Sequence, residues 1–188
     1  MSSDDYVKRS IADQVDRALV LEIIMDEYGT VLKRLIYSYV NDWNAASDLT
    51  QDTFITVYEK LESFQQRSSF KTWIFTIAIN KSKDYLKSWH YRNMVMNENF
   101  FFLKKAREKD PEASFLERDE HQELLKTIES LTVKYREVFL LHYYQDLSLA
   151  EISETLNIPL STVKTRLYRG QEKVKKLLSA SGRGEQHG

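Results

Sequence analysis

The sequence predicts an all-α protein built from two small helical domains that a flexible linker joins. Apolar residues recur three and four positions apart through most of the chain, which is the spacing of one face of an α-helix. Glycine and proline, which interrupt helices, occur only 5 and 2 times among 188 residues. No stretch alternates apolar and polar residues for long enough to predict a β-sheet, so long helices with few breaks are expected.

The composition is that of a globular protein and excludes several kinds of site. Hydrophobic residues make up 42% of the chain, which is enough for ordinary cores. There is no cysteine, so disulfides, thiol nucleophiles and thiolate metal sites are excluded. The four histidines lack the spacing of metal ligands. We therefore predict neither a metal site nor a cofactor.

The protein is predicted to be cytoplasmic. Its first ten residues, MSSDDYVKRS, lack the apolar run of a signal peptide. No segment approaches the roughly 18 consecutive apolar residues of a membrane-spanning helix. No integral membrane segment is expected.

The first domain is expected to contain three helical segments. Residues 11–40 predict one or two core helices, with Gly29 as a weak point, and residues 45–61 predict the next helix. Ser69 can cap a third helix over residues 70–91. The apolar side chains expected to face the core of this domain include Leu19, Ile23, Leu32, Leu35, Ile36, Leu49, Phe54, Val57, Tyr58, Leu61, Trp73, Ile74, Ile77 and Leu86.

Charge is distributed along the chain in blocks of alternating sign. The net charge is −1, yet residues 1–66 carry −6, 67–107 carry +7, 108–160 carry −7 and 161–188 carry +5. Polyanion binding depends on the local field rather than on the total charge. The two basic blocks predict that one chain holds DNA at two places.

The helix at residues 70–91 carries the first basic block and mixes lysines with aromatic side chains. Such a mixture can bind single-stranded nucleic acid, because bases stack on aromatic rings while lysines contact phosphates. The alternative is that the aromatic residues are core, which we favour for Trp73, Phe75 and Tyr85. For Trp89 and Tyr91, near the basic end, both interpretations stay open.

Periodicity is lost from residue 93 to about residue 115, which we interpret as an interdomain linker containing Pro111. Three consecutive phenylalanines, 100–102, are unusual in such a segment. Exposed aromatic side chains tend to find a partner, so these are expected to dock on a domain or another protein.

The stretch from residue 148 to 178 has the pattern of a helix-turn-helix. Apolar residues at helical spacing are followed by a break at Asn157-Ile158-Pro159, since proline cannot continue a helix. A second helix follows, with Ser161 or Thr162 as its cap. Its predicted buried seam is Val163, Leu167, Gly170, Val174 and Leu177, and its other sides are basic. This pattern predicts a recognition helix for the DNA major groove, although a solvated helical hairpin has a similar pattern.

Three motifs in this order carry a wider resemblance: DLTQDTFITVY, then SSFKTWIFTIAIN with DYL, and far downstream LTVKYREVFLLHYYQDLSLAEISETLNIPLSTVKTRLYRG. Together they resemble the extracytoplasmic-function sigma factors, small promoter-specificity subunits of bacterial RNA polymerase. The resemblance implies region 2 over residues 1–96, a linker over 97–115, region 4 over 116–180 and a disordered tail over 181–188. It also implies transcription initiation without catalytic activity, and an anti-sigma factor as a partner.

The resemblance assigns expected roles within region 2. The helix containing DLTQDTFITVY would bind the clamp of the polymerase β′ subunit, with polar contacts from Asp48, Gln51 and Asp52; the alternative is an acidic solvated face. The loop and helix after it would melt and read the minus-ten element in single-stranded form. The residues expected there are Gln66, Arg67, Ser68, Lys71, Asn80, Lys83, Lys87 and Trp89. Thr76 stands where relatives often have arginine, which puts the minus-ten preference in doubt.

Region 4 would read the minus-thirty-five element as double-stranded DNA, and would contact the polymerase β subunit. Residues expected at this element are Ser161, Thr162, Lys164, Thr165, Arg166, Tyr168, Arg169 and Lys173. Arg166 and Arg169 could each make a bidentate contact to guanine, and Tyr168 could pack on a thymine methyl group. The linker would run through polymerase, which would give the phenylalanines at 100–102 a partner.

Two other functions are compatible with parts of the sequence. A stand-alone helix-turn-helix regulator explains the 148–178 stretch and leaves the basic aromatic helix at 70–91 unexplained. A helical nuclease or phosphohydrolase using Asp48 and Asp52 lacks a partner cluster or a histidine motif.

Overall fold

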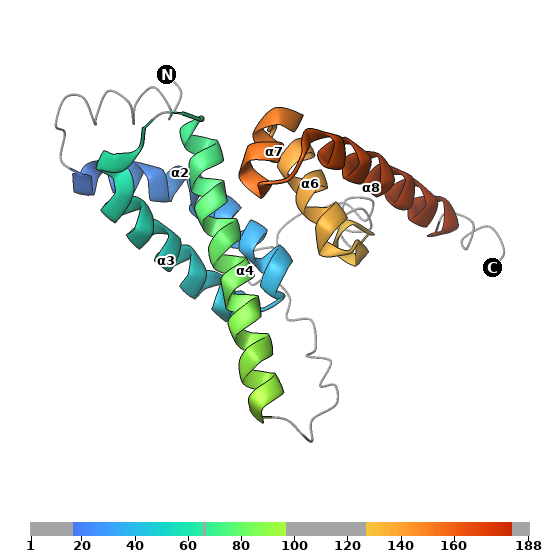
Figure 1. Ribbon diagram of the computed structural model, residues 1–188, viewed down its shortest axis with the longest axis horizontal. Helices are drawn as coiled ribbons and strands as arrows, with labels where there is room; N and C mark the ends of the chain where they lie inside the picture. Colours follow the sequence, from blue (N-terminus) through green and yellow to red (C-terminus); the bar gives the residue numbers. More distant parts are fainter. Residues whose placement is uncertain (1–16, 66, 97–126, 182–188) are drawn as a thin grey trace. The chain divides into compact units, whose positions relative to one another are not determined.

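The chain separates into two compact units, Met1–Lys109 and Asp110–Gly188, which are described one at a time. The computed structural model describes residues 17–65, 67–96 and 127–181 (Figure 1). Within those ranges the regular elements are α-helices and a 3-10 turn, and no strand occurs. This confirms the all-α prediction. Gln66, the phenylalanines at 100–102 and the predicted linker lie outside the described residues, so those predictions stay predictions.

Within the described residues, the first unit contains three packed α-helices and a short 3-10 turn. They are α2 (Arg17–Val40), α3 (Trp43–Lys60), η1 (Leu61–Ser63) and α4 (Phe70–Met96), and each α-helix contacts the other two. Gly29 does not interrupt α2, which runs through it as one helix. All three helices contribute buried side chains to the core. These include Val20, Ile24, Tyr28, Leu32, Ile36, Ala46, Phe54, Val57, Phe70, Ile74, Phe75, Ala78 and Ile79.

A tight corner joins α2 to α3. Asn41 adopts the left-handed conformation at φ 55°, which asparagine tolerates better than most residues. The Asp42 carboxylate then caps α3, because its Oδ1 accepts hydrogen bonds from the backbone N–H groups of Asn44 at 3.0 Å and Ala45 at 3.1 Å. Trp43 stacks on Tyr37 with ring centroids 3.9 Å apart. The corner therefore satisfies two backbone N–H groups at the start of α3.

Aromatic rings fill the corner between η1 and α4. The ring centroid of Phe64 lies 5.6 Å from that of Phe70, in an edge-on arrangement, and 5.0 Å from that of Trp73. The ring centroids of Tyr28 and Phe70 are 6.1 Å apart. The predicted cap is confirmed, since the Ser69 hydroxyl accepts a hydrogen bond from the Thr72 N–H at 3.1 Å. Of the aromatics favoured as core, Phe75 is fully buried, and Trp73 and Tyr85 are half-buried.

Two side chains predicted to face this core are exposed instead. Leu19 is 47% exposed and Tyr58 is 40% exposed. In α2 the buried stripe begins at Val20 and Ile24, one position later than predicted, so Leu19 is rotated toward solvent. In α3, Phe54 and Val57 already fill the inward face beside Tyr58.

The second unit contains α6 (Val133–Tyr143), α7 (Leu149–Leu156) and α8 (Leu160–Ser181), preceded by helical residues 127–130. Its core includes a cluster of Ile128, Leu131, Tyr135 and Val174, with Phe139, Leu140 and Leu178 packed against it. Helix α7 begins with a capping box: the Ser148 hydroxyl accepts from the Glu151 N–H, and the Glu151 carboxylate accepts from the Ser148 N–H.

The predicted break between the two helices of the helix-turn-helix is confirmed. Asn157 ends α7 in the left-handed conformation at φ 51°, and α8 starts three residues later. The predicted cap is wrong, because Leu160 is already helical and the Pro159 carbonyl accepts from the N–H groups of Thr162 and Val163. Ser161 and Thr162 thus lie in the first turn of α8.

The predicted seam of α8 is correct for four of its residues and wrong for the fifth. Val163, Leu167, Gly170 and Val174 are buried, whereas Leu177 is 42% exposed. Leu178 packs against the cluster instead. The seam drifts around the helix by one position, since a helix of 3.6 residues per turn does not match a repeat of 3.5 over several turns.

Candidate nucleic-acid and polymerase interfaces

Helix α8 turns a polar, cationic side away from the core of its unit. Of the eight residues predicted to contact DNA in this unit, Ser161, Lys164, Thr165, Tyr168, Arg169 and Lys173 are exposed, whereas Thr162 and Arg166 are half-buried. Tyr168 is 64% exposed, an unusual degree for a tyrosine in a packed domain. We define the outer face of α8 as Lys164, Thr165 and Tyr168. It is suited to polar and van der Waals contact with base edges.

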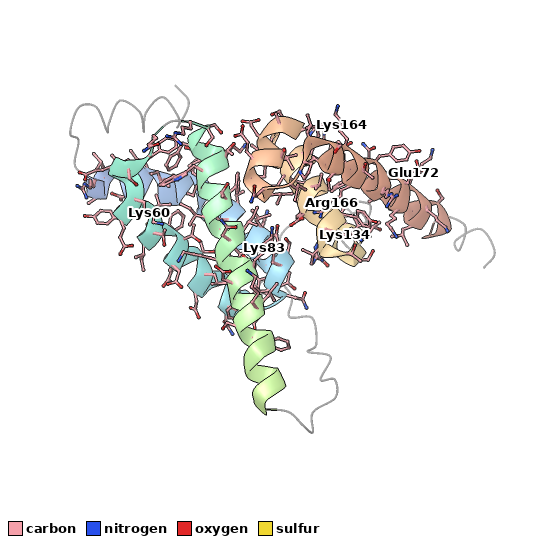
Figure 2. All side chains as sticks on the ribbon, viewed as in Figure 1. Lys60, Lys83, Lys134, Lys164, Arg166 and Glu172 are labelled. Atoms are coloured by element: carbon pink, nitrogen blue, oxygen red, sulfur yellow. The ribbon has the colours of Figure 1, made fainter. Side chains whose placement is uncertain are left out.

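Arg166 lies on a different side of α8 from the outer face. Its Nη1 donates a hydrogen bond to Oε1 of Glu137 on α6 at 2.8 Å. The Glu137 side chain is 6% exposed and that of Arg166 is 25% exposed. Figure 2 shows Arg166 on the side of α8 toward α6, with Lys164 and Glu172 on the opposite side. The predicted guanine contact of Arg166 therefore competes with an ion pair inside the unit.

Tyr135 on α6 engages two more cations of α8. The hydrogen bond that Arg169 donates to the Tyr135 hydroxyl lowers the pKa of that hydroxyl. Burial raises this pKa, whereas the positive charges of Lys134, Arg169 and Lys173 lower it further. The ammonium groups of Lys134 and Lys173 lie 5.1 and 5.6 Å from the centre of the Tyr135 ring, within cation–π range. We define the docked edge of α8 as Arg166, Arg169 and Lys173.

Helix α4 brings together part of the set predicted for single-stranded DNA. Asn80 and Lys87 are exposed and Lys83 is half-buried, and steps of three and four place them on one outer side of the helix. Lys87 pairs with the neighbouring Asp84 at 3.1 Å. Asn80, Lys83 and Lys87 therefore form one polar surface.

The other residues predicted for this role lie elsewhere on the unit. Lys71 and Trp89 are each nine positions from Asn80, about two and a half helical turns, so they occupy the opposite side of α4. The Trp89 side chain is 47% exposed. Arg67 is exposed and Ser68 half-buried in the turn before α4. The aromatic–cation mixture is thus split between two sides of one helix.

The outer side of α3 carries the residues predicted to bind polymerase. Asp48, Gln51 and Asp52 are all exposed, and Asp48 and Asp52 are one turn apart. Ile55 continues this stripe and is 56% exposed, a position that the sequence pattern did not single out. The surface is therefore acidic, with one exposed apolar side chain beside the carboxylates.

Residues 17–65, 67–96 and 127–181 contain no group of three or more histidine, cysteine or acidic side chains that could hold a metal ion. Across the same ranges no helix is both long and apolar enough to cross a bilayer.

Two residues of α6 that matter to the recognition helix were missed by sequence reasoning, Tyr135 and Glu137. One signal was present: Glu137 stands four positions before the buried Leu141, so a carboxylate occupies the apolar side of a helix. A charged residue in that place needs a buried partner.

Comparison with known proteins finds two family matches along the chain. Sigma-70 region 2 matches residues 24–90, and sigma-70 region 4 matches residues 121–174. The ECF RNA polymerase sigma factor SigW of Bacillus subtilis is 32% identical over 82% of this chain and 87% of its own. The ECF RNA polymerase sigma-E factor of Escherichia coli is 30% identical over 81% of this chain and 83% of its own.

Solved structures share the fold. The sigma factor RpoE of Bartonella quintana, in complex with the anti-sigma factor NepR, superposes with a TM-score of 0.68 at 23% identity over 84% of this chain and 96% of its own. CnrH, in complex with the cytosolic domain of CnrY, has a TM-score of 0.64 at 22% identity over 95% of this chain and 99% of its own. With both regions matched in order and relatives aligned over most of their length, the chain belongs to the sigma-70 family, as an RNA polymerase sigma factor of the extracytoplasmic-function type.

Proposed function

We propose that this sigma factor directs core RNA polymerase to promoters through three surfaces: α3 binds the polymerase, α4 binds unpaired bases of the minus-ten element, and α8 reads the minus-thirty-five element. The observation that carries this proposal is the construction of α8. Its apolar seam is buried in the unit, while Lys164, Thr165 and Tyr168 stand on the outer face of a helix that follows a tight turn. A helix so presented fits the major groove.

On α4, Asn80 is the residue proposed to meet an unpaired base. Its amide can both donate and accept, which suits a base edge, and Lys83 and Lys87 on the same side of the helix can contact phosphates. Trp89 lies on the opposite side of α4, so its proposed stacking on a base would need the strand to pass around the helix. Arg67 and Ser68 stay proposals in the turn before α4, and Lys71 stays a proposal in its first turn.

On α3, the acidic stripe of Asp48, Gln51 and Asp52 is proposed to contact the β′ clamp of the polymerase. Carboxylates at a protein interface steer association with a basic partner. Ile55, exposed beside them, supplies apolar area to the same contact. The β subunit is the proposed contact of region 4. No catalytic step is proposed, because promoter melting can be driven by binding to unpaired bases.

An anti-sigma factor is the proposed regulator. RpoE and CnrH, whose folds are similar, are both described in complexes, the first with the anti-sigma factor NepR and the second with CnrY. Cytoplasmic localisation is part of the same proposal, since a sigma factor acts where polymerase and DNA are.

The test of the polymerase surface is assembly of the full chain with core polymerase. Asp52→Arg reverses a charge at the centre of the proposed contact, and Asp84→Arg makes the same change on α4, in the same unit and outside that contact. We expect Asp52→Arg to lower the affinity for core and Asp84→Arg to leave it within twofold. Equal affinities for the wild type and Asp52→Arg would contradict the assignment of α3.

A further inference from the structure

Glu137 on α6 presents a buried carboxylate to the recognition helix. The residue is 5% exposed, and its Oε1 accepts a hydrogen bond from Nη1 of Arg166 at 2.8 Å. A carboxylate removed from water must be paired, because its desolvation is otherwise uncompensated. The buried carboxylate of Glu137 therefore holds the guanidinium of Arg166 at α6, because the ion pair compensates for the loss of its hydration.

The pairing divides the side chains of α8 into two sets. Arg166, Arg169 and Lys173, the docked edge, are spaced three and four apart and meet Glu137 or Tyr135 on α6. Lys164, Thr165 and Tyr168, the outer face, are exposed. Arg166 is the member of the docked edge that is most enclosed, with a side chain 25% exposed.

We propose that Glu137 is a positioning residue for promoter recognition: it holds Arg166 inside the unit, withholds that charge from DNA, and leaves sequence reading to the outer face of α8. This inference rests on the proposed function of α8. It revises the expectation that Arg166 contacts a guanine, and it assigns Arg166 the task of fixing the orientation of the helix on α6.

The withheld charge has a measurable consequence. Each lysine or arginine that neutralises a phosphate adds about one to the slope of log Kd against log salt concentration. A released Arg166 would add such a contact without adding a specific one. Glu137→Leu removes the acceptor from the buried site, so it should release the guanidinium toward solvent and DNA.

The experiment uses the full chain reconstituted with core polymerase and duplex promoter fragments, with the upstream element either intact or scrambled. Kd is measured over a salt series for the wild type, Glu137→Leu, and the double variant Glu137→Leu/Arg166→Met. Glu154→Gln, a change at an exposed carboxylate of α7, is the control for loss of one negative charge. Thermal unfolding of each variant checks that region 4 is folded.

We expect Glu137→Leu to steepen the salt slope by about one and to reduce discrimination between intact and scrambled elements at least threefold. The double variant and Glu154→Gln should keep the wild-type slope. A double-variant slope about one below the wild type would show that Arg166 already contacts DNA, and would overturn the inference. So would an unchanged slope in folded Glu137→Leu, which is what a purely structural role predicts.

The double variant keeps the inference testable if Glu137→Leu fails to fold, since its comparison with the wild type alone decides whether Arg166 contacts DNA. Transcription by the wild-type holoenzyme is measured first. If the wild type starts no transcripts, the proposed function fails; if it starts them and the slopes contradict the expectation, only the role of Glu137 fails.

Discussion

Replacing Gly170 with alanine should stabilise region 4. Gly170 lies inside α8, and a methyl group there would meet Cβ and O of Tyr135 at 3.8 Å and Cδ2 of Phe139 at 3.9 Å, which are ordinary van der Waals contacts. Glycine in a helix interior is about 1 kcal/mol less favourable than alanine, and a buried methyl group contributes up to about 0.8 kcal/mol more. The expected gain in the free energy of unfolding is therefore about 1–2 kcal/mol.

The measurement is thermal unfolding of the full chain followed by circular dichroism, fitted with one transition for each unit. For a domain of this size, about 1 kcal/mol corresponds to roughly 4–8 °C in Tm. Gly29→Ala is the matched control, because an added Cβ at Gly29 has nothing within 4 Å and lies in the other unit. It should raise only the transition of region 2, by the helix-propensity contribution alone.

Gly170→Leu completes the series, since atoms beyond Cβ would have to displace Tyr135 or Phe139 and should lower the Tm. A lower Tm for Gly170→Ala would mean that α8 lies closer to α6 than these distances, and the packing of region 4 described above would be wrong.

The remaining predictions concern the charges around α6 and the contact with polymerase. Arg166→Met strands the buried carboxylate of Glu137 and should cost about 3–5 kcal/mol of unfolding free energy, which urea unfolding would measure; equal stability would mean that the pair is dispensable. The pKa of the Tyr135 hydroxyl lies below its ordinary value of 10.0. Ionisation of this hydroxyl therefore stabilises the fold above pH 10.0, and that stabilisation is lost as the pH falls through the lowered pKa. Arg169→Gln should move this ionisation upward in an ultraviolet absorbance titration, which would be unmoved if Arg169 pointed away. Asp52→Arg should weaken binding to core polymerase about tenfold, or about 1.4 kcal/mol, in a fluorescence titration; binding as tight as that of the wild type would place Asp52 outside the contact.

Much of the fold could be predicted because its signals are local. Helical periodicity, the break at Asn157 and Pro159, and the Ser69 cap each depend on a few neighbouring residues, and each is present in the structure. Errors arose where position around a helix mattered. Leu178 rather than Leu177 packs in the seam, a difference of about 100° that spacing alone does not fix at the end of a long helix.

The division of α8 into two sets of side chains could not be predicted from the sequence. Arg166 and Glu137 are 29 positions apart, so nothing local indicates that they pair. A basic residue next to a buried seam is equally compatible with a DNA contact and with an internal ion pair. Only the packing of α6 against α8 distinguishes them, through the burial of Glu137.

Transcription by reconstituted holoenzyme tests whether the chain directs polymerase to promoters. Core polymerase with and without the full chain is given a library of random promoter fragments, and the starts of the transcripts are sequenced. We expect transcription starts that depend on the chain, at fragments that share two separated sequence elements. Changing the outer face with Thr165→Ala/Tyr168→Ala should alter only the upstream element. Binding of the chain to DNA with no dependent transcripts, or a single shared element unaffected by that variant, would contradict this expectation.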